Sequence, residues 1–306
     1  MNLITNSQYY DTWYKHVRLK DSTKKNYTYA LERFGDFLIW KGFSLRNGET
    51  LNFDRFYYST KEDDYEPIDL QIFLDFVDYL KENKSIHVVE SSITALKNYF
   101  GFLEFMELIE ENPLARFSGS FYERPLKNRA LSEKQSKTLL EASYQADPFF
   151  KQWFVLILLL LTCGLRATEL CKLRKSQIMF PLNTIVIDKG QKTFASSVHM
   201  TEALSEYLAE YLRHPAYTNW LGSEEDKEVF FYKDKPLTPH KLNKIIKSLV
   251  SQTSINRNVT CHDLRATMAY LLYTNGVNTR AIQSQLRHKK LATTLLYLPI
   301  GDKLIN

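Results

Sequence analysis

Four short stretches of the sequence carry side chains whose chemistry suits a phosphate ester. They are GLRATEL at 164–170, the DKGQK turn at 188–192, HDLR at 262–265, and LRH at 286–288 with Tyr297 nine residues after its histidine. Guanidinium groups are permanently charged forks that match phosphate oxygens, and histidine exchanges protons near neutral pH. Lysine can supply a proton and tyrosine a nucleophile. No stretch is decisive alone, so the interpretation depends on their order and flanking residues.

In that order, the stretches resemble the motifs of the tyrosine recombinase (phage integrase) family. GLRATEL matches the Gly-Leu-Arg-x-x-Glu-Leu box, HDLRAT matches the His-x-Leu-Arg box, and LRHKKLATTLLYL matches the Leu-Gly-His…Thr…Tyr ending. The motif set is complete, and the resemblance covers about residues 131–300. The sequence departs from the family at Arg287, where Gly is usual. It also has only nine residues after Tyr297, a shorter tail than many relatives pass to a neighbouring subunit.

The resemblance implies a covalent mechanism centred on Tyr297. The phenol would form a phosphotyrosyl bond to the 3′ end of the cut DNA and free a 5′-hydroxyl. Because a phenol attacks phosphorus and leaves about equally readily, the bond energy is conserved without water or metal. Arg166 and Arg265 would neutralise the charge that builds on the non-bridging phosphate oxygens.

Proton transfer and local support are expected from further residues. Lys189 would protonate the leaving 5′-oxygen, and Lys192 in the same turn is the alternative. His262 is the expected general base or proton relay, and His288 the expected hydrogen-bond donor to the phosphate. Glu169, three residues after Arg166, is expected to hold the local geometry.

Other site chemistries have little support in the sequence. His262 stands beside Cys261, but no second Cys/His pair lies at ligand spacing, so we expect no metal. No GxxxxGK[ST] motif is present, so ATP use is not expected, and we expect no cofactor. The run at 172–175 can be read either as a solvated face or as a DNA contact.

Helices are expected to position most of these residues. In the N-terminal part, the apolar spacing predicts a helix from the N-cap Ser22 to Gly42, a loop over 44–66, a helix starting at Pro67, a helix over 87–106 and a short helix before Pro113. In the C-terminal part it predicts a helix capped by Ser132, a buried helix over 149–161, a short helix at 168–173, extended runs at 184–187 and up to Met200, and helices at 201–213, 239–252, 263–274 and 278–287.

The predicted fold class is therefore mainly α. The resemblance implies that residues 1–117 are a helical core-binding domain that clamps DNA and that 131–306 are a mostly helical catalytic domain with a small β-sheet, with 118–130 expected as the linker. The low count of turn formers, 10 Gly and 9 Pro in 306 residues, agrees with a helical chain.

The net charge of +5 is unevenly distributed. Residues 1–117 hold 14 Lys/Arg and 19 Asp/Glu, whereas 118–306 hold 26 and 16. We therefore expect DNA to contact the C-terminal part, together with the first long helix, which is locally basic. The predicted DNA-binding residues are Lys24, Lys25, Arg33, Lys127, Arg129, Lys172, Arg174 and Lys175.

The compartment is expected to be reducing and cytoplasmic. Three cysteines are too few, and odd in number, for a disulfide scaffold. The first residues lack the layout of a signal peptide, and the longest apolar run, Trp153–Leu161, is too short to span a membrane. It is better interpreted as a core helix.

The function expected from the resemblance is site-specific DNA recombination, by an Xer-like two-domain enzyme or a mobile-element recombinase of the same build. Integration, resolution and transposition remain open. The expected partner is double-stranded DNA with inverted-repeat half-sites, bound by a homodimer at one site and a homotetramer in the synapse. The alternatives are a type IB-like DNA topoisomerase and a catalytically silent DNA-binding relative.

Overall fold

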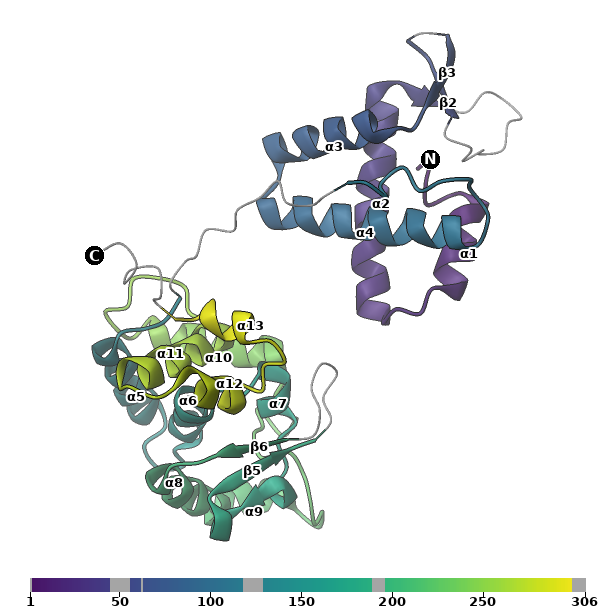
Figure 1. Cartoon of the computed structure of the whole chain (residues 1–306). Helices are drawn as coiled ribbons and strands as arrows, with labels where there is room; N and C mark the ends of the chain where they lie inside the picture. The colour runs from purple at the N-terminus through teal and green to yellow at the C-terminus, as the bar shows by residue number, and fades with distance from the viewer. Residues whose placement is uncertain (1, 45–55, 62, 118–128, 189–195, 299–306) are drawn as a thin grey trace, which may run out of the picture. The chain divides into compact units, whose positions relative to one another are not determined.

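The computed structural model describes residues 2–44, 56–61, 63–117, 129–188 and 196–298. The chain divides into two compact units, Met1–Pro125 and Leu126–Asn306, each described here by itself (Figure 1). The boundary lies within the predicted linker 118–130, of which 118–128 fall outside the described residues. Both units are mainly helical, and each holds one small three-stranded sheet, which confirms the predicted fold class.

The N-terminal unit packs its long helices around an aromatic core. Its elements are α1 Gln8–His16, α2 Asp21–Lys41, β1 Phe43–Ser44, β2 Phe56–Ser59, β3 Asp64–Pro67, α3 Leu70–Asn83 and α4 Ile86–Phe105. Phe34 of α2 stacks on Phe73 of α3 with ring centroids 5.1 Å apart, and meets Phe76 edge-on at the same distance. Such rings bury large apolar areas and fix how the helices pack.

Four expectations for the N-terminal unit were wrong in detail. The helix predicted from the N-cap Ser22 begins two residues earlier, at Asp21, and is capped by the backbone of Lys20, whose carbonyl accepts from the following turn. Within the predicted loop 44–66, β2 and β3 form an antiparallel pair in which Tyr58 faces Tyr65. Each of these strands has only four residues, too few to show an apolar alternation, so the sequence carries little sign of them.

The remaining differences concern helix ends. The helix predicted to start at Pro67 starts at Leu70, because the Asp69 side chain caps it, while Pro67 ends β3. No helix forms before Pro113, since residues 106–117 make turns. Gly42 is confirmed as the stop of α2, with a left-handed φ of 108° that suits glycine.

The C-terminal unit is built around the buried helix α6. Its elements are α5 Glu133–Ala146, α6 Gln152–Cys163, α7 Ala167–Cys171, β4 Ile178–Met179, β5 Thr184–Ile187, β6 Ser196–His199, α8 Glu202–Arg213, α9 Pro215–Leu221, α10 Pro239–Val250, α11 Cys261–Thr274, α12 Thr279–Leu286 and α13 Leu291–Leu295. Helix α6 packs against α5, α8 and α11. The predicted capping box of Ser132 with Gln135 is confirmed, and so is the burial of the apolar run.

The sequence did not predict β4, α9 or α13. The strands β4, β5 and β6 form one antiparallel sheet in that order. Helix α11 starts at Cys261, two residues earlier than expected, because Thr260 and Asp263 form a capping box. Within the described ranges, no helix is both long and apolar enough to cross a membrane.

Candidate active site

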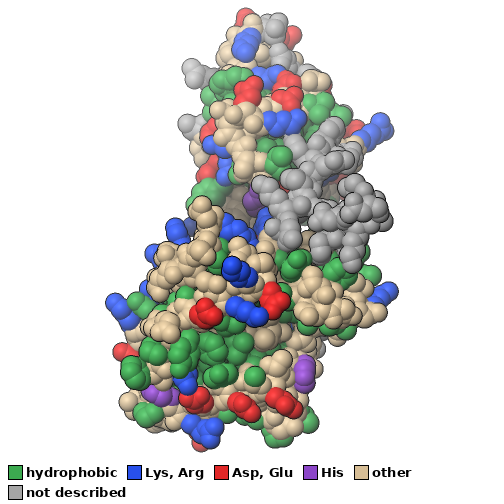
Figure 2. All heavy atoms as spheres, turned by 90° about the vertical axis from the view of Figure 1, so that its left-hand side faces the viewer, with side chains coloured by type: hydrophobic (Ala, Val, Ile, Leu, Met, Phe, Trp, Pro, Cys, Tyr) green, Lys and Arg blue, Asp and Glu red, His purple; other side chains and the backbone are tan. Residues whose placement is uncertain are grey.

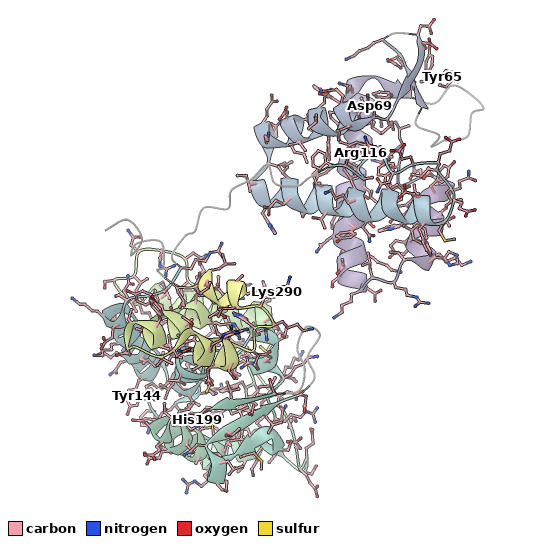
Figure 3. All side chains as sticks on the ribbon, in the orientation of Figure 1. Tyr65, Asp69, Arg116, Tyr144, His199 and Lys290 are labelled. Carbon is pink, nitrogen blue, oxygen red and sulfur yellow. The ribbon has the colours of Figure 1, made fainter. Side chains whose placement is uncertain are left out.

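Four segments of the C-terminal unit bring five of the six predicted catalytic side chains together, all except Lys189, which lies outside the described residues. They are the α6–α7 turn, the first turns of α11, the turn after α12, and Tyr297, two residues past the end of α13. At the first, Gly164 ends α6 with a φ of +57°, and a Cβ there would lie 2.3 Å from the Met268 methyl of α11. Glycine therefore suits the left-handed backbone there, and any added Cβ would force the Met268 methyl to shift. Helix α12 is also tied to the sheet, because Gln285 Nε2 donates to the backbone carbonyl of His199 on β6 at 3.0 Å. Figure 3 labels His199 at the end of that strand.

Arg265 links three of these segments. Its side chain is 2% exposed, and its guanidinium donates to the carbonyls of Gly164 and Leu286. The same group lies 3.1 Å from Nε2 of His288. Burial, followed by the charges of Arg166 and Arg287, lowers the pKa of Arg265 to about 10. The group therefore stays charged at neutral pH while it holds the site together.

Tyr297 lies in contact with His262 of the same chain. Its hydroxyl is 3.2 Å from His262 Nε2, and the two rings meet edge-on at 5.4 Å. The backbone N–H of Tyr297 donates to the Thr294 carbonyl at 2.9 Å, and the next residue, Leu298, is buried in an apolar cluster with Met268. The predicted nucleophile thus packs within the C-terminal unit of its own chain.

The surroundings of both histidines lower their pKa and so favour the neutral imidazole at pH 7. Burial lowers the pKa of His262, and nearby arginines add to this although Asp263 opposes it. Burial, then Arg265 and Arg166, lowers the pKa of His288 to about 4. A neutral imidazole at 262 can accept the proton of the Tyr297 hydroxyl.

The hydrogen bonds of His288 determine its tautomer. Arg265 can only donate, so His288 Nε2 accepts from it, and Nδ1 carries the proton toward Thr294 Oγ1 at 2.9 Å. In this arrangement the ring offers no free N–H. The predicted donation from His288 to a phosphate would require the ring to exchange one of these partners.

Arg166 shares a carboxylate with Arg287. Glu169 accepts from Arg166 Nη1 at 2.7 Å and from its backbone N–H at 2.8 Å, while Arg287 Nη2 lies 2.6 Å from the second carboxylate oxygen. Although burial raises the pKa of Glu169, Arg287 and Arg166 outweigh it, so the pKa is lowered. Glu169 therefore holds the position of Arg166 as an ionised group.

The sequence did not predict the part that Arg287 and Thr294 play in this cluster. Arg287 was noted only as a departure from the family, and it pairs with a residue 118 positions away. Thr294 is fully buried and bonded to His288. In the sequence, only its position in the Thr…Tyr ending pointed to a role for Thr294 in the site.

Lys189 and Lys192 lie outside the described residues, between β5 and β6. Among the residues that the structure describes, no group of three or more His, Cys, Asp or Glu side chains is placed to hold a metal. Cys261 has its thiol buried against the Leu165 carbonyl.

The predicted DNA-binding residues of the N-terminal unit differ in how free they are. Lys25 is exposed, whereas Lys24 donates to the Tyr14 carbonyl at 2.8 Å. Arg33 is half-buried, with Nη1 3.5 Å from Oγ of the buried Ser92. Of the three, Lys25 is the most accessible to a phosphate.

The predicted DNA-binding residues of the C-terminal unit also differ in how free their side chains are. Four are exposed: Arg129, Lys172, Arg174 and Lys175. Arg174 pairs with Asp226 at 3.8 Å and Glu228 at 3.7 Å, while Lys127 lies outside the described residues. Figure 2 shows a face on which basic and acidic side chains are interspersed, so charge alone does not outline a DNA-binding surface there.

Comparison with known proteins gives a family match. The family model described as "Phage integrase family" matches residues 129–302, which include every described residue of the cluster.

Curated relatives match across nearly the whole chain. A tyrosine recombinase of Pseudothermotoga lettingae is 26% identical over 297 residues, which span 97% of this chain and 94% of the relative. Tyrosine recombinase XerC of Bacillus licheniformis is 26% identical, spanning 83% of this chain and 84% of the relative.

Solved structures share the fold. The Tn1549 transposon integrase in complex with a circular intermediate DNA matches with a TM-score of 0.69 at 18% identity, over 97% of this chain and 95% of that one. The XerH recombinase bound to a palindromic difH substrate matches with a TM-score of 0.68 at 20% identity, over 92% of this chain and 77% of that one.

Proposed function

The chain belongs to the phage integrase family, and on that premise we propose how its residues cut and rejoin DNA. It is a site-specific DNA recombinase, and its partner is DNA. The observation that carries the proposed mechanism is the Tyr297 hydroxyl 3.2 Å from a neutral His262, in a cluster that also holds Arg166 and Arg265.

In the first step Tyr297 attacks the scissile phosphate. Its oxygen forms a bond to phosphorus, its proton passes to Nε2 of His262, and the bond from phosphorus to the 5′-oxygen breaks. The 3′ end is left joined to the protein, and a 5′-hydroxyl is freed. The 5′-hydroxyl of another strand then attacks the phosphotyrosyl bond. The phosphate is joined to that strand, the bond to Tyr297 breaks, and the phenol regains its proton.

The two arginines stabilise the charge that develops between these states. Arg166 is about one-third exposed and held by Glu169, so part of its fork remains open to a phosphate. Arg265 lies deeper, and its fixed position avoids reorganisation during the reaction. Each donor of this kind is worth roughly 10²–10³ in rate.

The proton for the leaving 5′-oxygen is assigned to Lys189, with Lys192 as the alternative. Lysine suits this step because its ammonium group carries several donors on a flexible stem. In the described arrangement His288 accepts a hydrogen bond from Arg265. To donate to the phosphate, its ring would first have to give up Arg265 at Nε2 or Thr294 at Nδ1.

The assembly is proposed to be symmetric. Two copies would bind inverted half-sites and two such dimers would form the synapse, which is the arrangement that paired strand exchange requires. The structurally similar XerH was solved on a palindromic substrate. The DNA contacts would include Lys25, Lys172 and Lys175, which are exposed.

A plasmid assay tests this function. The Tyr297→Phe protein would select its DNA site from a random duplex library, and two copies of that site would be placed on one supercoiled plasmid. Wild-type protein should delete or invert the intervening segment without ATP or metal. Relaxation of plasmids that lack the site would indicate a type IB-like topoisomerase, and binding without any exchange would indicate a silent relative.

A further inference from the structure

Arg287 occupies a position with two unfavourable features. Its backbone has φ 55° and ψ 46°, the left-handed region that favours glycine. Its side chain is 4% exposed, and its Nε is buried without a hydrogen-bond partner. A buried charge is costly unless it is paired, and the partner here is Glu169.

Glu169 is itself shared with Arg166, so the three side chains form one charge cluster. Two positive groups and one negative group leave a net positive charge beside the position proposed for the phosphate. Without Arg287, the charges of Arg166 and Glu169 would cancel. Because these side chains are buried, their charges interact with one another and with a phosphate more strongly than they would in water.

We propose that Arg287 is a positioning residue that offsets the Glu169 carboxylate and so keeps the charge of Arg166 available to the scissile phosphate. This inference rests on the proposed function. Its alternative is a purely mechanical tether, in which the ion pair only fastens the turn after α12 to α7. Both predict slower cleavage when Arg287 is lost, but only a charge effect depends on the charge of the phosphate.

Arg287→Gly is the most suitable variant. Glycine accepts the left-handed backbone without strain, and Arg287 lines a pocket of about 630 Å³, so its removal does not leave a sealed cavity. Arg287→Lys keeps the charge, and thermal melting of both variants establishes that they fold. Arg213→Ala is the matched control, since Arg213 is exposed on α8 and donates to the Ala209 carbonyl.

The test uses two forms of one probe, the half-site duplex selected by the Tyr297→Phe protein. One carries an ordinary phosphodiester at the cleaved position and the other a neutral methylphosphonate. Single-turnover release of the 5′-hydroxyl strand is measured with saturating protein. Cleavage of the phosphodiester by the wild type tests the proposed function separately from this inference.

With the wild type active, Arg287→Gly should slow cleavage of the phosphodiester about 10-fold or more, and of the methylphosphonate less than about 3-fold. Arg287→Lys should stay within about 3-fold of the wild type on both, as should Arg213→Ala. An equal slowing by Arg287→Gly on both substrates, or a failure of lysine to substitute, would overturn the proposal in favour of the tether.

Discussion

Gly164 offers a quantitative test of how the site is built. The change is Gly164→Ala, with Gly276→Ala as the matched control. Both glycines have positive φ, +57° and +81°, but a Cβ at 164 would lie 2.3 Å from the Met268 methyl, whereas a Cβ at 276 would meet nothing within 4 Å. The two substitutions therefore share the backbone strain and differ in the steric clash.

The magnitudes follow from these two contributions. Left-handed backbone costs a non-glycine residue roughly 1–2 kcal/mol, which is the whole cost expected at 276. Overpacking adds about 1–3 kcal/mol at 164, because Met268 is 1% exposed and cannot swing into solvent. Gly164→Ala should thus destabilise the protein by about 2–5 kcal/mol.

Urea denaturation followed by fluorescence measures both free energies of unfolding. Adding Met268→Ala to the Gly164→Ala protein should cost less than the sum of the two single changes, because the clash is removed. Equal destabilisation at 164 and 276, together with additive effects at 164 and 268, would refute the close approach of α6 and α11. Below its melting temperature Gly164→Ala should also cleave more slowly, since the Gly164 carbonyl positions Arg265.

Three further predictions concern the catalytic groups. Arg166→Ala should slow single-turnover cleavage of the selected half-site by about 10²–10³-fold or more at saturating protein, and a loss under about 5-fold would exclude Arg166 from charge stabilisation. His288 should titrate by NMR with a pKa of about 4. That pKa is below the value of an unfolded histidine, so the free energy of unfolding should fall as the pH is lowered from about 6.5 to 4. The fall should be less steep in His288→Gln. An ordinary histidine pKa would contradict the described burial of the ring. Lys189→Ala should be rescued by a 5′-bridging sulfur, a better leaving group, and absence of rescue would favour Lys192.

The candidate site residues could be named from the sequence because short stretches around them resemble the motifs of the tyrosine recombinase family. The GLRATEL and HDLRAT stretches place Arg166 and Arg265 beside the turn and helix start that position them. Long helices such as α4 were found because their apolar faces repeat over many turns.

The contacts between distant segments could not be predicted from sequence. The Arg287–Glu169 ion pair and the hydrogen bond of Arg265 to His288 exist only once α7, α11 and α12 pack together. The tautomer of His288 also depends on how these helices pack. The sequence predicted that His288 donates a hydrogen bond to the phosphate, but in the described structure both of its ring nitrogens already have partners. Helix α13 was missed because its five residues are too few to show periodicity.

The most direct test of the mechanism is covalent trapping on a nicked suicide half-site. Wild-type protein should form a DNA adduct that peptide mass spectrometry locates on Tyr297, without ATP or added metal. Tyr297→Phe should bind the same DNA with unchanged affinity and form no adduct. An adduct on another residue, or one that persists in Tyr297→Phe, would contradict the account.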